Sequence, residues 1–294
     1  MKQTDNFKIR CSGCGSLPDE PTITGFKWYD ANTNGTFDNG EVKIPGWRIN
    51  TTDLSTTLTF HTYTDANGNY AMPADWDNAY TIAEALPPNS TWMSIACVPE
   101  SGSMVCNSST SATVTIGDPS GNTTIGGPDF GNVCLGAGGG LTLGFWSNKN
   151  GAKQISSGDL ALLVALNLVN ANGSAFNPAS VSAFQSWLLS ANATNMANML
   201  SAQLAAMELN VSHGFVNGSA LIYAPGTNSA NAAGYATVNN IMSEANTSLG
   251  ANPLTTSGAV RLYQQFLKNA LDAANNNSNF VQPGPGSCPF TTPY

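Results

Sequence analysis

Residues 22–41 read TITGFKWYDANTNGTFDNGE, and this stretch carries the clearest structural pattern in the first half of the chain. Its first part, Thr22–Tyr29, is rich in β-branched and aromatic residues, which favour a pleated strand. Residues Asp30–Glu41 are rich in Asn, Asp and Gly, which favour turns. The residues that follow, Val42–Ile49, again read as strand. The stretch therefore predicts a long polar loop between two β-strands.

This loop fits the calcium-binding pattern D-x-[DN]-x-[DN]-G-x5-E at every fixed position. In such loops alternate side chains point at the ion, a glycine permits the turn, and the last glutamate binds through both oxygens. We expect one Ca²⁺, bound by the side chains of Asp30, Asn32, Asn34, Asp38 and Glu41 and by the carbonyl of Thr36. The alternative is a polar turn without metal. Because the flanks read as strand, no opening of a helix pair is expected.

Outward from this loop, short strand-like segments alternate with turns as far as Cys134. These segments are Gly46–Asn50, Leu58–Thr64, Tyr80–Glu84 and Ala112–Ile116. A further polar stretch with Asp65, Asn67 and Asn69 is expected to form a hairpin turn and not a second ion site. The spacing predicts an antiparallel β-sandwich over residues 22–134. Residues 1–21 are polar and are expected to form an N-terminal arm.

The second half of the chain has a helical pattern. A Gly-rich segment at residues 135–143 is expected to be a flexible hinge, and after it the apolar period changes from two to about 3.6. Ser156 with Asp159 reads as a capping box, and Asn177-Pro178 reads as the start of a helix through Leu188. Other helices are expected at 160–169, 195–209, 230–249 and 259–274. The chain is thus expected to be multidomain, with a mainly α-helical domain over residues 144–294 that ends in an irregular tail.

The composition excludes several kinds of partner. Charged residues make up only 10% of the 294 residues, and 18 acidic residues outnumber 10 basic ones. A net charge of -8 without a basic patch argues against nucleic-acid binding. No segment approaches the ~18 apolar residues of a membrane span. Low charge instead fits a surface outside the cell or one that packs against copies of itself, and Asn-x-Ser/Thr sequons would carry glycans if the source glycosylates.

Six cysteines are compatible with three disulfides and an oxidising compartment. We expect Cys97–Cys106, which closes a short loop between two strand-like segments, and Cys134–Cys288, which ties the hinge to the tail. Cys11–Cys14 is the third pair, although its C-x2-C spacing could also belong to a zinc site. The other alternative is six reduced, buried thiols.

Five motifs in order resemble the B-type repeats of bacterial surface adhesins, the SdrD-like B domain related to the collagen-adhesin B domains. They lie at Gly25–Gly35, Ile44–Trp47, Thr64–Tyr70, Tyr80–Glu84 and Asp129–Asn132. The resemblance implies a prealbumin-like sandwich, stabilised by calcium, that serves as a rigid stalk on the cell surface. Some proteins of this kind join a strand lysine to an asparagine side chain with the help of an acid. Here that implies Lys27, Asn132 and Glu84; the alternative is that Lys27 extends to solvent.

The helical half carries LTLGFWSN at residues 141–148, which resembles a G-[FY]-W-x-N motif of secreted bacterial proteins. No function follows from this motif, and we expect Phe145 and Trp146 to anchor the hinge in the helical core.

An enzyme is not expected. The two histidines, His61 and His213, lie in different halves, carboxylates are sparse in the helical half, and no catalytic motif is present. Two functions remain. The first is an extracellular structural subunit that forms a homopolymer, with the arm adding a strand to the sheet edge of a neighbour. The second is a surface adhesin whose helical domain or exposed Trp47, Trp76 and Trp92 bind a glycan or protein.

Overall fold

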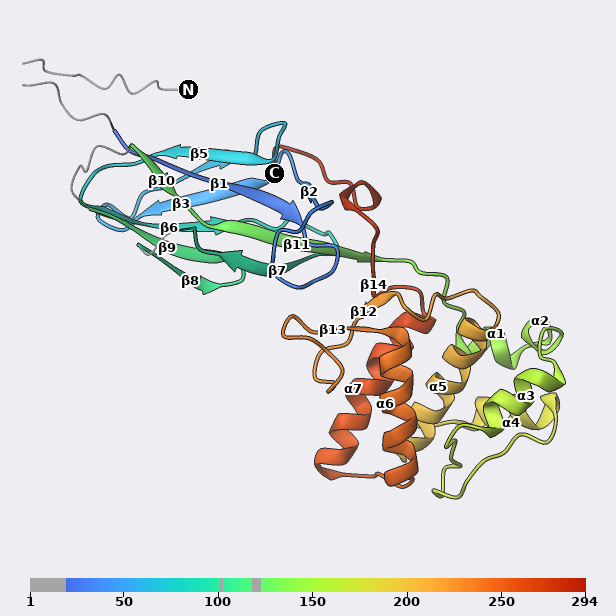
Figure 1. The fold of residues 1–294 in the computed structure, drawn as a ribbon. Helices are drawn as coiled ribbons and strands as arrows, with labels where there is room; N and C mark the ends of the chain where they lie inside the picture. Colours follow the sequence, from blue (N-terminus) through green and yellow to red (C-terminus); the bar gives the residue numbers. More distant parts are fainter. Residues whose placement is uncertain (1–19, 101–102, 118–122) are drawn as a thin grey trace, which may run out of the picture.

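The computed structural model describes residues 20–100, 103–117 and 123–294. Along the chain, strands β1–β11 come first and helices α1–α7 follow (Figure 1). We refer to residues 20–135 as the β part and to residues 141–279 as the helical part. The expected arm, apart from Glu20 and Pro21, lies outside the described residues, and so do Cys11 and Cys14.

One sheet of the β part has five strands in the order β4-β3-β6-β9-β8, each antiparallel to its neighbour. Alternate residues of β6 point into the core, where Tyr80, Ile82 and Glu84 are buried. These strands span Thr59–Tyr63 (β4), Arg48–Asp53 (β3), Asn78–Glu84 (β6), Ser111–Ile116 (β9) and Met104–Ser108 (β8).

The second sheet is built around β1 (Thr22–Tyr29) and β11 (Asp129–Gly136). Here the expectation of a wholly antiparallel sandwich is wrong, because β1 runs parallel to both β10 and β11. Parallel neighbours need a long crossover, and the chain between β1 and β11, which contains the entire other sheet, supplies it. The remaining strands of this sheet within the β part are β2 (Val42–Lys43), β5 (Asn69–Pro73), β7 (Trp92–Val98) and β10 (Thr124–Gly126).

The expected hairpin at residues 65–69 is a turn between the two sheets. Asp65 accepts hydrogen bonds from the backbone N–H of Asn67 (2.8 Å) and Asn69 (2.9 Å), as in a local polar turn. However, β4 pairs with β3, whereas β5 pairs with β1. The turn therefore carries the chain from one layer of the sandwich to the other.

The helical part packs around α5, which is buried along most of its length and contacts α3, α6 and α7. Its helices are α1 (Leu143–Ser147), α2 (Lys149–Ala152), α3 (Ser157–Val164), α4 (Val181–Ser190), α5 (Met196–Ser212), α6 (Val238–Ala251) and α7 (Gly258–Asn275). Short strands β12 (Leu221–Tyr223) and β13 (Tyr235–Thr237) lie at the end nearer the β part (Figure 1). No described helix is both long and apolar enough to cross a membrane.

Several helix boundaries differ from those expected. The capping box of Ser156 and Asp159 is confirmed, but α3 ends at Val164. Ser180, and not Asn177, caps α4 by accepting the N–H of Ala183 at 3.1 Å. The expected helix from residue 230 begins only at Val238, because residues 235–237 pair as a strand with β12. Each error arose where a polar or small residue could serve either a cap or a turn.

The GFW motif anchors α1 in the helical core. Trp146 is fully buried, and its Nε1–H donates to Oδ1 of Asn210 at 3.1 Å. The same Asn210 side chain binds both backbone groups of Leu141, at 3.2 and 2.9 Å. Phe145 is only partly buried against this core. The expected anchoring role is therefore confirmed, with Asn210 as a partner that the motif did not reveal.

Residues 136–140, which we call the connector, lie in the segment 135–143 that was expected to be a flexible hinge, and they contact the helical part closely. The side-chain oxygen of Asn277 accepts three consecutive backbone N–H groups, from Gly138 (2.6 Å), Gly139 (2.7 Å) and Gly140 (3.2 Å). A Cβ at Gly139 or Gly140 would collide with a backbone carbonyl oxygen of the helical part. These glycines therefore allow close packing, and the connector is held firmly.

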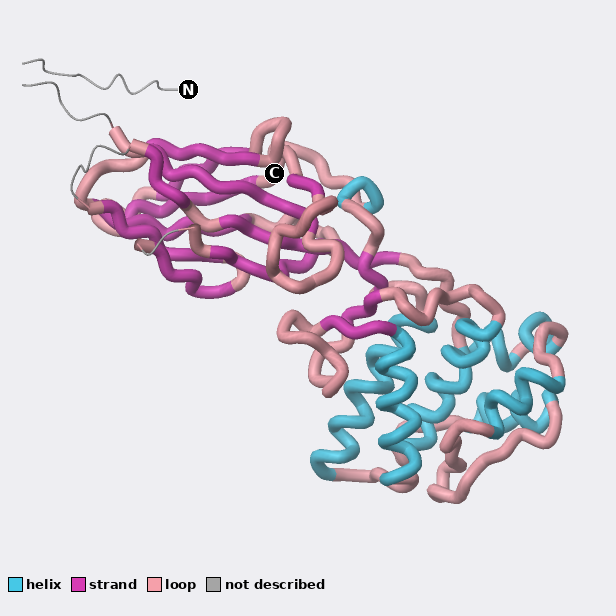
Figure 2. The backbone as a smooth tube through the Cα atoms, viewed as in Figure 1, coloured by secondary structure: helices cyan, strands magenta, loops and turns pink. Residues whose placement is uncertain are grey.

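The C-terminal segment, residues 280–294, returns to the β part (Figure 2). It begins as β14 (Phe280–Val281), which pairs with β11 and β12, and it contains a short 3₁₀ turn at Pro285–Ser287. Cys288 is joined to Cys134. At the end of the segment, the Tyr294 hydroxyl donates to the carbonyl of Ala85 at 2.9 Å. The chain thus enters and leaves the helical part along neighbouring strands.

Phe290 of this segment packs edge-on against Trp47 and Trp92, with ring centroids 5.2 and 5.9 Å away. Both tryptophans are buried. The expectation that they are exposed for ligand binding is therefore wrong, because the sandwich core and the returning segment cover them. Trp76 is half-buried.

Candidate functional site

The sandwich core contains a charged cluster made of Lys27, Glu84 and Asn132, all three of which are buried. Lys27 lies on β1 and Asn132 on the neighbouring parallel strand β11. Glu84 comes from β6 of the opposite sheet. The three residues named from the family resemblance therefore meet at one point between the two layers. The alternative that Lys27 extends to solvent is wrong, since its exposure is 0%.

The contacts within the cluster are direct. Lys27 Nζ lies 3.3 Å from Glu84 Oε2, and the Asn132 Nδ2–H donates to the same oxygen at 3.1 Å. Lys27 Nζ also donates to the carbonyl of Phe130 at 2.8 Å. Asn132 Oδ1 is buried and accepts no hydrogen bond from the described residues. One carboxylate oxygen thus holds the lysine amine and the asparagine amide side by side.

Burial shifts the protonation of both ionisable groups towards the neutral form. Desolvation lowers the pKa of Lys27 to about 8, although the charge of Glu84 opposes the change. Desolvation likewise raises the pKa of Glu84, although Lys27 opposes it. A proton shared between a buried amine and a buried carboxyl costs less than two separated charges. Burial therefore raises the fraction of neutral amine, which is a nucleophile, beside a protonated acid, relative to an exposed pair.

Alternation along β11 places Asn132 on the same face as Phe130 and Cys134, which are both buried in the sandwich core. The pairing of β11 with β7 shifts at this point, with Gly131 opposite Ala96 and Asn132 opposite Ser94, so the extra residue of the bulge lies on β7. Gly131 itself lies against the Trp28 ring so closely that a Cβ would collide with it. The Trp47 ring lies 4.8 Å from Lys27 Nζ and shields the amine from water.

The expected calcium loop forms a compact turn after β1. Asp30 is buried and accepts the backbone N–H groups of Asn34 (3.1 Å) and Gly35 (2.8 Å). Asp38 Oδ2 accepts the side-chain amides of Asn32 and Asn34, both at 2.7 Å. The loop positions therefore converge, with Gly35 at φ +78°, a conformation that favours glycine.

These residues carry the oxygen atoms that a calcium ion needs, but their side chains are not arranged around an ion. Among the described residues, no three His, Cys, Asp or Glu side chains are grouped closely enough to hold a metal. A cation would replace the two amide N–H donors at Asp38, and the Asn32 and Asn34 amides would turn to present their oxygens. Glu41 Oε1 is buried and accepts no hydrogen bond from the described residues, so it is available as a ligand. Carboxylate and amide oxygens are the ligands that Ca²⁺ prefers.

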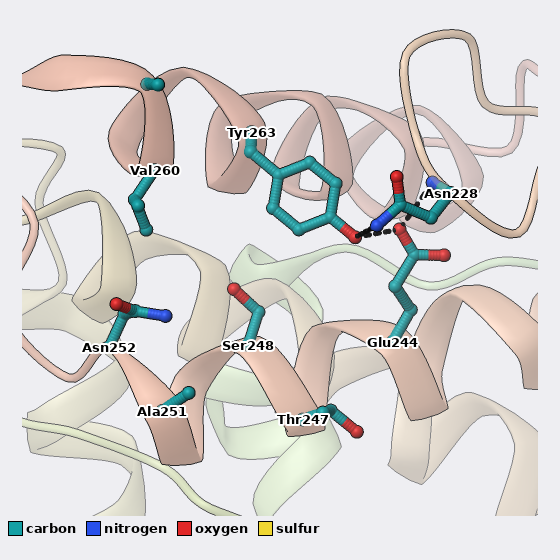
Figure 3. A pocket seen from close by; sticks show the side chains of 9 residues that line it. Asn228, Glu244, Thr247, Ser248, Ala251, Asn252, Val260 and Tyr263 are labelled. Carbon is teal, nitrogen blue, oxygen red and sulfur yellow. Dashed lines mark hydrogen bonds between the residues drawn. The ribbon is translucent and has the colours of Figure 1, made fainter.

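A groove of about 530 Å³ lies between α6 and α7 (Figure 3). Its carboxylate, Glu244, accepts the backbone N–H of Asn228 and of Ser229, each at 2.7 Å. Tyr263 also donates its hydroxyl to Glu244. Because these donors occupy both carboxylate oxygens, Glu244 is a structural acceptor between the helices and not a free acid or base.

The cysteines and histidines have structural positions. The structure contains the disulfides Cys97–Cys106 and Cys134–Cys288, the two pairings expected within the described residues. His213 is the C-terminal cap of α5, and its Nε2 lies 3.2 Å from Asp159 Oδ1. His61 is exposed on β4.

No family model and no curated protein sequence matches the chain. Several solved structures are similar to part of the chain. One is a Mobiluncus mulieris adhesin that contains intramolecular disulfide, isopeptide and ester bond cross-links (12% identity, 39% of this chain, 41% of that chain, TM-score 0.26). Others are the shaft pilin SpaA of Lactobacillus rhamnosus GG (11%, 39%, 50%, 0.26) and the major pilin SpaD of Corynebacterium diphtheriae (12%, 40%, 33%, 0.27). The chain spans half or less of each, and the finer assignment to the SdrD-like B domain stays a prediction.

Proposed function

We propose that this chain is an extracellular structural subunit of a cell-surface filament or sheath, and that its β part is closed by an amide bond between Lys27 and Asn132. The buried Lys27–Glu84–Asn132 cluster carries this proposal. Its reactive groups face one another inside a sealed core, where no substrate has room. Chemistry of this kind changes the protein itself, so it serves mechanical stability and not turnover.

The proposed reaction needs no outside reagent. Neutral Lys27 Nζ attacks Asn132 Cγ, and the new Nζ–Cγ bond forms as the Cγ–Nδ2 bond breaks. Protonated Glu84 gives its proton to Nδ2 and takes up the proton that the attacking amine loses, so that ammonia leaves and the acid is restored. The hydrogen bond from Asn132 Nδ2 to Glu84 Oε2 already places the acid at the leaving group.

Two further features support a place outside the cell. Disulfides persist in oxidising compartments and are rare in the cytosol, and this chain has one in the β part and one between β11 and the C-terminal segment. The low share of charged residues, 10%, leaves little repulsion against packing of copies. A disulfide-bonded, weakly charged subunit fits an extracellular assembly.

We also propose that the loop of Asp30, Asn32, Asn34, Thr36, Asp38 and Glu41 binds one Ca²⁺. An ion that binds only the folded state stabilises it by about 2.7 kcal/mol at a hundredfold excess over Kd. Removal of calcium by a chelator is therefore expected to lower the melting temperature of the protein, as measured by calorimetry. Asp30→Ala should abolish this sensitivity, because it removes a buried ligand.

The matched control is Asp65→Ala in the other polar turn. A chelator should lower the melting temperature of this variant as much as that of the original protein. If chelation leaves the melting curve of the original protein unchanged, the calcium proposal fails.

Assembly is proposed to occur through the N-terminal arm, residues 1–21, which would add a strand to an edge of a neighbouring subunit. The five-stranded sheet ends at β4 and β8, and Val105 on β8 is 66% exposed. Such edges recruit strands from partners. A head-to-tail contact of this kind propagates as a filament unless its rotation closes a ring.

Deletion of residues 1–20 is expected to convert ordered polymers into folded monomers, as measured by light scattering and electron microscopy. A variant with residues 1–20 in scrambled order controls for length and charge, and it should also remain monomeric. Unchanged polymers after deletion would show that the arm is not the linker. Monomers of the original protein that bind a glycan array would instead favour the adhesin.

A further inference from the structure

We propose that the calcium loop is also a docking site of the helical part, so that binding of the ion strengthens this contact between the two parts of the molecule. This inference rests on the proposed calcium site and adds to it a mechanical consequence. It is carried by Asn231, which lies in the segment before β13 and donates to Thr33 in the loop that follows β1. Figure 1 shows the segment before β13 on the side of the helical part that faces the β part.

The contact is made by one side chain. Asn231 Nδ2 donates to the backbone carbonyl of Thr33 and to its Oγ1, both at 2.9 Å. Thr33 lies between two of the proposed calcium ligands, Asn32 and Asn34. It is only 2% exposed and has φ +58°, an uncommon conformation for a β-branched residue. The helical part thus binds the loop at the point where its backbone must hold an unusual shape.

Asn231 is held in place for this contact by its own segment. Its Oδ1 accepts the N–H groups of Ala233 and Tyr235, both at 3.0 Å, and its N–H donates to the Tyr235 carbonyl at 2.8 Å. Tyr235 in turn is buried and packs with the sandwich core, although it belongs to β13. The amide of Asn231 is therefore preorganised, and its donor group is directed at Thr33.

Elsewhere along this boundary Tyr235 packs into the sandwich core and β14 pairs with β11, whereas open space adjoins the contact of Asn231. A cavity of about 440 Å³ lies between the calcium loop and the segment of Asn231, lined by Gly35, Ile95 and Ala233 among others. The hydrogen bonds of Asn231 form only when the loop holds one conformation, because they need the two oxygens of Thr33 in fixed positions. An ion that holds the loop in that conformation lowers the entropy lost on docking, which couples the two events.

Coupling of this kind is reciprocal, so loss of the docking contact must weaken calcium binding by the same factor. Loss of hydrogen bonds worth about 1 kcal/mol corresponds to roughly fivefold in affinity. Asn231→Ala is therefore expected to raise the calcium Kd about fivefold by isothermal titration calorimetry, although it removes no proposed ligand. Asn240→Ala, at an exposed asparagine of α6, is the matched control and should leave the Kd unchanged.

Amide hydrogen exchange provides a second measurement on the original protein. Calcium is expected to slow exchange at residues 231–237 by a factor similar to the change in Kd, and to have no such effect in Asn231→Ala. If the original protein binds calcium but neither the Kd of the variant nor the exchange at 231–237 responds, the docking inference is wrong and the calcium site stands. If the original protein binds no calcium, the calcium site itself is wrong, and the coupling with it. Should Asn231→Ala not fold, the exchange measurement on the original protein decides.

Discussion

The intact protein is expected to be one ammonia lighter than its sequence mass. Lys27 and Asn132 form an amide bond in the sandwich core, and the Asn132 side chain releases ammonia. Mass spectrometry of the denatured, reduced chain measures this directly. Glu84→Ala should restore the full mass, since the acid that relays the proton is lost. A peptide map of the original protein should join the peptides of Lys27 and Asn132.

Lys43 supplies a matched control within the same chain. Its Nζ donates to Asn69 Oδ1 at 2.8 Å, so it forms a second lysine–asparagine pair. That pair is only half-buried, and the lysine donates directly to the amide oxygen without a carboxylate that bridges the two groups. Lys43→Ala should therefore retain the ammonia deficit. A full mass in the original protein would rule out the cross-link.

The cross-link also has a large expected effect on stability. It closes a loop of roughly 100 residues, which the loop-entropy relation values at about 4.7 kcal/mol. In Glu84→Ala the buried Lys27 in addition loses its partner, which costs about 3–5 kcal/mol. The β part of this variant is therefore expected to unfold at much lower urea concentration than that of the original protein.

Gly140→Ala is expected to destabilise the helical part by about 3 kcal/mol, the upper end of the usual cost of overpacking. The added Cβ collides with the carbonyl oxygen of Ala274, and a backbone group cannot move aside as a flexible side chain can. Displacement of the connector also weakens its hydrogen bond to Asn277. Urea unfolding followed by the circular dichroism signal of the helices measures the change.

Gly286→Ala is the control for this substitution, because nothing lies within 4 Å of the Cβ that it adds. Its stability should match that of the original protein. If Gly140→Ala is equally stable, the connector is the flexible hinge that its composition suggested.

Local features of the fold could be predicted from the sequence. The strand Thr22–Tyr29 and the polar loop after it lie where expected, because β-branched residues and Asn/Asp/Gly turns act over a few residues. Lys27, Glu84 and Asn132 were reached only through the family resemblance. Their meeting depends on the pairing of β1 with β11 and on the packing of β6 from the opposite sheet, and neither leaves a local pattern in the sequence.

Non-local features were missed for the same reason. Five residues rich in glycine read as flexible, but their conformation is fixed by Asn277, which lies far along the chain. The returning C-terminal segment reads as irregular, yet Phe290 completes the packing around Trp47 and Trp92. Nothing in the sequence distinguished Asn231 from the many other asparagines of the chain.

The disulfide Cys134–Cys288 determines how the chain responds to tension. A pull applied at both ends passes from Cys134 directly to Cys288 and leaves the 154 residues of sequence separation between them slack. The helical part therefore bears no load and can keep its fold while the molecule is stretched. A reductant would transfer the load to that segment, and its unravelling would add roughly 500 Å of extended chain at about 3.3–3.6 Å per residue. The oxidation state of one sulfur pair thus decides whether the molecule behaves under load as a short tether or as a long, extensible one.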